Sequence, residues 1–137
     1  MKRILSVFLL VVLSFSLFAC GNKNTVDLWA NALYAEDTVL GSGAKTIFVD
    51  VIAQEKTVTF TINTDKETVG DALVEHNLVS GEKGAYGLYV KFVNGIEADY
   101  DKNQSYWAFT KSGESLLTGV DGEKIEDNTH YELTYTN

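Results

Sequence analysis

The sequence predicts an α+β domain in which one helix packs against a single mixed sheet, behind an N-terminal export signal. Three observations lead to this fold class. Alternating apolar and polar residues begin near residue 45 and mark two consecutive strands, a capped helical pattern follows, and further strand patterns complete the chain. This element order, β-β-α-β-β-β, is typical of a helix covering one face of a sheet, and it suits a β-grasp-like arrangement.

Residues 1–19 have the features of an export signal. Lys2 and Arg3 give a positive start, and an apolar run from Ile4 to Ala19 follows, interrupted only by three serines. A positive start, a short apolar core and a small residue before the cleavage point are typical of a secretory signal peptide. Because a membrane-spanning helix needs roughly 20 apolar residues, we expect cleavage rather than a permanent span.

The stretch Leu17-Phe18-Ala19-Cys20 resembles the lipobox of bacterial lipoproteins, although Phe18 is bulkier than the usual residue. The resemblance implies that Cys20 becomes a lipidated N-terminus carrying palmitate, and that the mature chain is held on the extracytoplasmic face of the cell membrane. An ordinary secreted protein with a leftover thiol is the alternative. Cys20 is the only cysteine, which excludes an internal disulfide and a multi-cysteine metal site.

The mature chain is strongly acidic. Cleavage removes Lys2 and Arg3 and no acidic residue, so 9 basic residues remain against 19 acidic ones, a formal net charge of −10. Nucleic-acid binding needs clustered Lys and Arg, so we expect no nucleic-acid partner. Electrostatic attachment to anionic lipid is disfavoured for the same reason, which leaves the lipid on Cys20 as the membrane contact.

Residues 20–44 are predicted to be a tether and residues 45–137 the folded domain. The tether begins with polar residues and ends with the flexible sequence Gly41-Ser42-Gly43. From residue 45 onward, Ile47, Val49 and Val51 lie on one face of a strand. A turn at Gln54-Glu55-Lys56 leads to a second strand with a threonine-rich face, and the two strands predict a β-hairpin.

The helix is predicted to begin at Thr68 and to run for about three turns to residue 77. Thr68 and Asp71 fit the capping pattern that satisfies the first free backbone N–H groups. Gly81, Gly84 and Gly87 then predict a mobile loop. The remaining strand patterns are residues 88–92, followed by a tight Asn94-Gly95 turn, residues 106–109 and residues 130–135.

No catalytic or metal-binding pattern stands out, and we expect a protein that is not an enzyme and has no metal site. His76 and His130 are the only histidines and have no metal-type spacing. Asp99, Asp101 and Asn103 weakly resemble a calcium loop, but the glycine at the sixth position and the distant glutamate are missing. Neither a nucleophile elbow nor a phosphate-binding loop is present.

The informative residues are apolar. Leu116-Leu117 follows the turn sequence Lys111-Ser112-Gly113-Glu114 and precedes Thr118-Gly119, so both leucines are expected in a loop. Two consecutive loop leucines either fold back onto the core or form part of an apolar contact surface.

Several short motifs in order resemble the C-terminal β-domain of transcobalamin and intrinsic factor. The motifs are Tyr86-Gly87-Leu88-Tyr89-Val90, Val93-Asn94-Gly95-Ile96, Tyr106-Trp107-Ala108-Phe109, Gly119-Val120 and a closing strand ending in Tyr135. In those vitamin carriers this domain closes over one face of cobalamin and clamps it against a helical-barrel domain. The resemblance implies ligand contacts at Val90, Phe109 and Leu116. These 137 residues hold no segment for the second domain. We therefore expect a corrinoid to bind only weakly or together with a partner, or the fold to serve another task.

We therefore expect a surface-anchored, non-enzymatic lipoprotein that binds a soluble ligand and passes it to a membrane transporter. No resident cofactor is expected, and cobalamin or another corrinoid is the leading ligand. A protein–protein interaction or adhesion module on the cell surface is the alternative, with a surface protein as its partner. The predicted ligand-binding residues are Tyr89, Val90, Phe109, Leu116 and Leu117.

Overall fold

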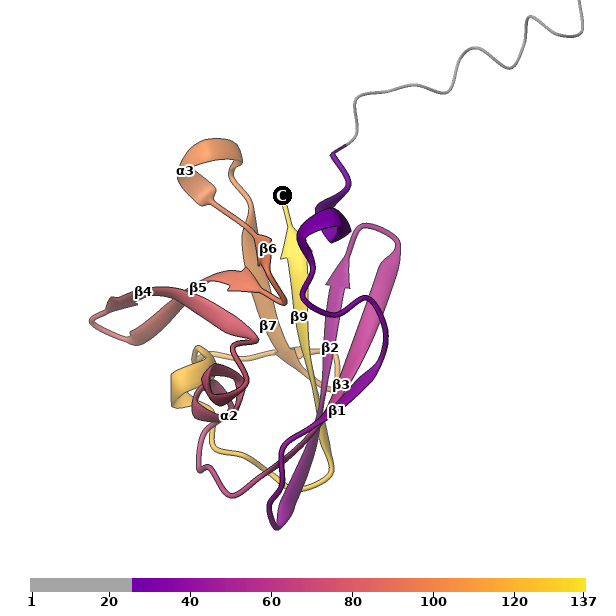
Figure 1. Ribbon diagram of the computed structural model, residues 1–137. Coiled ribbons are helices and arrows are strands. Elements are labelled where there is room, and N and C mark those ends of the chain that lie inside the picture. Colours follow the sequence, from indigo (N-terminus) through magenta and orange to yellow (C-terminus); the bar gives the residue numbers. More distant parts are fainter. Residues whose placement is uncertain (1–25) are drawn as a thin grey trace, which may run out of the picture.

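A computed structural model describes residues 26–137, and within them nine strands form two sheets (Figure 1). The predicted signal peptide and Cys20 lie outside the described residues. The larger sheet has the order β1-β3-β2-β9-β7-β8, with bounds β1 (Thr38–Leu40), β2 (Lys45–Ala53), β3 (Lys56–Thr64), β7 (Tyr106–Lys111), β8 (Glu114–Ser115) and β9 (Thr129–Thr136). The smaller sheet contains β4 (Val79–Gly84), β5 (Gly87–Val93) and β6 (Ile96–Glu97).

The helical elements of the described chain are short. They are α2 (Val69–Glu75), the single turn α3 (Tyr100–Asn103), and the 3₁₀ helices η2 (Leu28–Asn31) and η3 (Val120–Gly122). None of the helices in residues 26–137 has the length and apolar character needed to cross a membrane.

The predicted α+β class and the order β-β-α-β-β-β are wrong, because the fold is largely β. The helix ends at Glu75 instead of residue 77, and Asn77 has a positive φ of 56° that ends helical geometry. The sequence pattern missed β1, β6 and β8 because strands of two or three residues are too short to show alternation. The glycine-rich segment expected to be a mobile loop is strand β4.

The central strands follow the predicted pattern. β2 and β3 form the expected antiparallel hairpin, in which Val49 pairs with Phe60. β9 pairs in parallel with β2 on its other side, which places Tyr131 next to Val49. Because side chains alternate across a strand, the same face of all three strands is apolar and forms the floor of the core.

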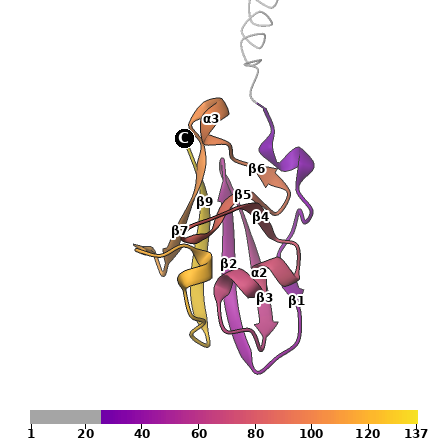
Figure 2. The same cartoon turned by 90° about the vertical axis from the view of Figure 1, so that its left-hand side faces the viewer.

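The helix α2 and the smaller sheet cover this apolar face. Figure 2 shows β4, β5 and α2 lying in front of the larger sheet. Val69, Ala72 and Leu73 of α2 are buried in the core. The predicted cap is confirmed, since the Thr68 hydroxyl accepts a hydrogen bond of 3.2 Å from the backbone N–H of Asp71.

The folded part of the chain starts well before residue 45. The side chain of buried Asn94 accepts a hydrogen bond from the backbone N–H of Tyr34 and donates one to the Tyr34 carbonyl, both at 2.9 Å. The Trp29 indole N–H donates to the carbonyl of Ala53 at 3.0 Å. Residues 28–40 therefore dock on the domain, and in this stretch the chain is not a free tether.

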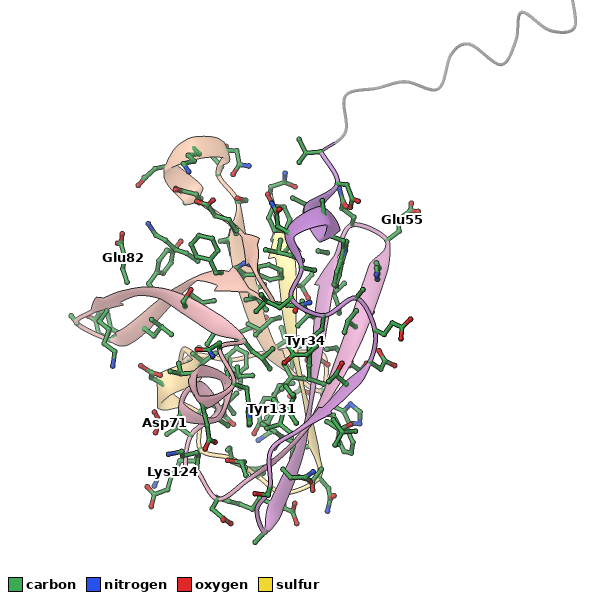
Figure 3. All side chains as sticks on the ribbon, in the orientation of Figure 1. Tyr34, Glu55, Asp71, Glu82, Lys124 and Tyr131 are labelled. Carbon is green, nitrogen blue, oxygen red and sulfur yellow. The ribbon has the colours of Figure 1, made fainter. Side chains whose placement is uncertain are left out.

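Tyr131 makes the stability of the fold depend on pH in the alkaline range. It lies between the sheet and α2 (Figure 3) and is fully buried, and this burial raises the pKa of its hydroxyl above the ordinary value of 10.0. The neighbouring Lys111 forms ion pairs with Glu126 (2.8 Å) and Glu123 (3.4 Å), and mainly the hydrogen bond to Glu126 raises its pKa as well.

A raised pKa in the folded state stabilises the protein fully below the unfolded pKa, and the stabilisation is lost as the pH rises through the folded pKa. We therefore expect the free energy of unfolding to fall above about pH 10. Tyr131→Phe should make that fall shallower, which urea titrations at a series of pH values would measure. Parallel pH curves for the two proteins would contradict this role for Tyr131.

Candidate functional site

The β4–β5 hairpin projects sideways from the body of the molecule (Figure 1). Tyr86, in the turn that joins the two strands, has a fully exposed side chain (99%). The pairing of the strands shifts between Ser80 and Gly81, so that Lys91 is an extra residue on β5. Such a bulge bends a strand and increases its twist, which directs the outer part of the hairpin away from the larger sheet.

The two faces of β5 have different surroundings. Tyr89 pairs with Glu82 across the hairpin and is 48% exposed. Glu82 also binds the Lys91 ammonium at 3.0 Å, and this hydrogen bond raises the pKa of Lys91. Val90 is half-buried and packs against the core. Neighbouring residues of a strand point to opposite faces. The side chains of Tyr89 and Val90 therefore cannot both rest on the same face of a flat ligand.

Phe109 lies on the side of β7 that faces the core. Its ring stacks on that of Tyr131, with centroids 5.8 Å apart and an angle of 18° between the planes. Phe109 is half-buried, so one part of the ring remains accessible. β5 packs against β7, which makes Val90 and Phe109 residues of neighbouring strands.

The loop leucines lie in the segment between β8 and η3. Leu116 is half-buried, whereas Leu117 is fully exposed. The end of this segment is held against the start of β5, because the carboxylate of Asp121 in η3 accepts a hydrogen bond of 2.9 Å from the backbone N–H of Leu88. Leu88 is a half-buried residue of the same region that the sequence prediction did not include.

We define the apolar wall as Leu88, Val90, Phe109, Leu116 and Leu117. These residues come from β5, β7 and the segment before η3, three elements that the tertiary structure brings to one region. Tyr89 belongs to the opposite face of the hairpin. Leu88 could have been predicted as a wall residue from the sequence, because it lies two residues before Val90 and its side chain is therefore on the same strand face.

Two clefts formed by described residues lie elsewhere. They have volumes of about 570 Å³ and about 240 Å³, and Leu28 and Glu97 line both. None of the predicted ligand-binding residues lines either cleft. The wall is therefore separate from these two clefts.

The residues of the weak calcium-loop pattern make local hydrogen bonds in and around α3, and Asp99 caps the start of this helix. The Asp99 carboxylate accepts from the backbone N–H of Asp101 at 3.0 Å, and the Asn103 side chain accepts from the backbone N–H of Ser105 at 3.1 Å. Residues 26–137 contain no group of three or more His, Cys, Asp or Glu side chains arranged to hold a metal ion. Ser105 is buried, and its hydroxyl donates to Asn103.

Residues 66–137, from just before α2 to the end of β9, match the profile of DUF4430, a domain of unknown function. The chain belongs to the DUF4430 family. This match contains the whole apolar wall and leaves out β1, β2 and β3. Among curated proteins, none matches this chain.

Several solved structures resemble this DUF4430 protein, and two of them are informative. One, at 1.30 Å resolution, is a protein of Ruminococcus gnavus ATCC 29149 described as a candidate metal-binding protein; the identity is 37%, the TM-score is 0.65, and the match covers 69% of this chain and 98% of that one. The other is haptocorrin in complex with Cbi, with 16% identity and a TM-score of 0.52. That match covers 68% of this chain and 25% of haptocorrin. The fold is thus transcobalamin-like, as the sequence motifs indicated.

Proposed function

We propose that this protein is a surface-anchored, non-enzymatic lipoprotein that captures a soluble ligand on the apolar wall, with a corrinoid as the leading ligand. The observation that carries the proposal is an accessible apolar surface on a fold shared with haptocorrin. Leu117 is fully exposed, and its chain neighbour Leu116 and the Phe109 ring of β7 are half-buried. A soluble protein gains about 1.5–3 kcal/mol when such a leucine is buried, so this surface favours an apolar partner.

The shape of the wall suits a flat ligand. Its side chains come from two strands and one loop, and none of them lines either of the two clefts described above. A corrinoid is a flat macrocycle whose rim carries amide groups, and one of its faces can rest on such a surface. A one-sided contact leaves the other face open, and we infer that a second protein, such as a membrane transporter, covers it during transfer.

A corrinoid is itself a metal-containing ligand. The related R. gnavus protein is described as a candidate metal-binding protein. A corrinoid carries its cobalt inside the macrocycle, so a protein can bind this metal through contacts to the ring and its side groups. No cluster of protein ligands is needed for that mode of metal binding.

The predicted lipid on Cys20 would keep this wall near the membrane. Val26 is the sixth residue after Cys20, and six residues span at most about 20 Å when fully extended. Because residues 28–40 dock on the domain, only a short segment separates the domain from the anchor. A ligand captured on the wall would therefore stay within reach of a transporter in the same membrane.

We expect micromolar binding of cobalamin or cobinamide, measured by calorimetric titration and by the visible spectrum of the ligand. The double variant Phe109→Ala, Leu116→Ala should weaken binding by at least tenfold, because removing each apolar contact costs on the order of 1 kcal/mol. Val39→Ala is the matched control, since Val39 is 68% exposed on β1 at the far edge of the sheet. Equal affinities of the double variant and the control would exclude the wall as the site.

The alternative function, a protein–protein interaction or adhesion module, has one specific feature in its favour. In β7 only Thr110 and Lys111 pair with β8, so the outer edge of residues 106–109 has no strand partner among the described residues. An extended peptide can add to such an edge. Absence of a corrinoid response together with capture of one specific surface protein would favour this function.

A further inference from the structure

The first described residues, α3 and the end of β9 lie at the same end of the molecule (Figure 1). Residues of all three segments line a polar cleft. Its volume is about 570 Å³, and its lining includes Leu28, Gln54, Glu97, Asn103 and Tyr135. The smaller cleft of about 240 Å³ shares Leu28 and Glu97 with it and adds the apolar side chains of Phe92 and Ile96. Volumes of about 300–1,000 Å³ are typical of small-ligand sites.

One wall of this cleft is fixed by the side chain of Gln54. Its amide N–H donates to the carbonyl of Val26 at 2.8 Å, and its oxygen accepts from the backbone N–H of Leu28 at 3.4 Å. Asp27 accepts from the backbone N–H of Trp29 at 3.0 Å and so caps η2. These contacts hold the segment against the β2–β3 turn, so the cleft is formed before any ligand arrives.

The opposite wall is a hydrogen-bonded group of polar side chains. One carboxylate oxygen of Glu97 binds the Lys102 ammonium at 3.1 Å. The Asn103 amide donates to the Tyr135 hydroxyl at 3.4 Å. Glu97 is 41% exposed, and its second carboxylate oxygen has no hydrogen bond among the described residues. This side of the cleft therefore offers the Glu97 carboxylate as an acceptor, together with the aromatic ring of Tyr135.

The charges of the lining select the kind of ligand. Asp27 and Glu97 are the charged side chains that line the two clefts, and both are acidic. Anionic ligands are repelled by this arrangement, and cationic ligands are attracted. We propose that the cleft binds a small organic cation, with its ammonium group on Glu97 and its apolar body against Leu28 and Phe92.

Lys102 acts in this site as an internal competitor. Its side chain is 70% exposed, and its ammonium occupies the carboxylate that the ligand would use. An exposed ion pair contributes only about 0–1 kcal/mol, so an incoming ammonium group can displace Lys102 at little cost. Removing the Lys102 side chain should therefore strengthen binding of the cation. Removing the Glu97 carboxylate should abolish the preference for a cationic over a neutral ligand.

The test compares three probes with similar bodies and different charges: 2-phenylethylamine, 2-phenylethanol and 3-phenylpropionate. Each is titrated into the full-length chain in a non-ionic detergent, and binding is followed by NMR shifts of the Leu28, Phe92 and Glu97 amides. We expect the amine to bind about fivefold more tightly than the alcohol, the size of effect that one partly exposed ion pair supplies. The carboxylate probe should bind least.

The variants decide which residues are responsible. Glu97→Gln should reduce the affinity for the amine to that for the alcohol. Lys102→Ala should increase the affinity for the amine. Lys124→Ala is the matched control, because it removes the same charge at the opposite end of the molecule (Figure 3). Equal binding of amine and alcohol, or the same result for Lys102→Ala and Lys124→Ala, would overturn the proposal. The apolar wall proposed for corrinoid binding is made of other residues. The outcome of this test therefore does not depend on whether a corrinoid binds there.

Discussion

Asn94→Ala should lower the free energy of unfolding by about 3–4 kcal/mol, since it leaves buried polar groups without partners and places alanine at a positive φ. Asn94 is 0% exposed, and its side chain makes two hydrogen bonds of 2.9 Å to the backbone of Tyr34. Its φ of 51° lies in the left-handed region, which asparagine tolerates and alanine does not. The measurement is urea unfolding followed by tryptophan fluorescence.

Two further variants separate the two causes. Asn94→Gly removes the side-chain hydrogen bonds but adopts the positive φ freely, so it should be less destabilising than alanine. Asn94→Asp keeps the acceptor for the Tyr34 N–H and loses the donor to its carbonyl. In Asn94→Ala the backbone amide of Tyr34 should also lose protection from hydrogen exchange. A loss of stability below about 1 kcal/mol would show that water replaces the side chain without cost.

Gly81→Ala should disrupt the β4–β5 hairpin and lower the free energy of unfolding by about 3 kcal/mol or more, as overpacking against a fixed backbone does. A Cβ at Gly81 would overlap the carbonyl oxygen of Tyr89 and would lie 2.9 Å from the backbone nitrogen of Lys91. Both obstacles are backbone atoms of the bulge, so no change of side-chain conformation relieves the overlap. The hairpin would have to separate at the position where Val90 joins the apolar wall.

Gly84→Ala provides the matched control on the same strand. A Cβ at Gly84 meets its nearest neighbour, the carbonyl oxygen of Gly87, at an ordinary contact distance of 3.9 Å. We therefore expect its stability to stay within about 0.5 kcal/mol of the wild type. If corrinoid binding on the wall is correct, Gly81→Ala should also abolish it, whereas Gly84→Ala should retain it. Equal stabilities of the two variants would contradict the structural reason given for Gly81.

The sequence predicted the elements that have a strong local signal. β2 and β3 each contain nine residues, and buried residues occupy every second position from Ile47 in β2 and from Val58 in β3. The cap at Thr68 and the Asn94-Gly95 turn were visible for the same reason, because each depends on residues adjacent in the chain. The motifs of the transcobalamin-like domain also lie in the segment that matches the DUF4430 family.

The predicted ligand-binding residues remain a prediction, and the structure shows only where each of them lies. Val90, Phe109 and Leu116 come from elements of one region, whereas Tyr89 lies on the opposite face of the hairpin. The cleft around Glu97 was missed, because its residues are distributed from residue 26 to residue 137 without a shared spacing. A sequence pattern reports only what neighbouring residues have in common.

By itself the sequence determined the central hairpin, the capped start of α2 and the strands that carry the core, since alternation and capping act over a few residues. Only the tertiary structure decided that the chain is largely β. Gly81 and Gly84 have no strand preference of their own, and they lie in β4 because its backbone groups pair with those of β5. Likewise, residues 28–40 were expected to be part of a tether, yet the side chains of Gln54 and Asn94 hold them on the domain through Leu28 and Tyr34. Such contacts join residues far apart in the chain, and they exist only when the chain folds.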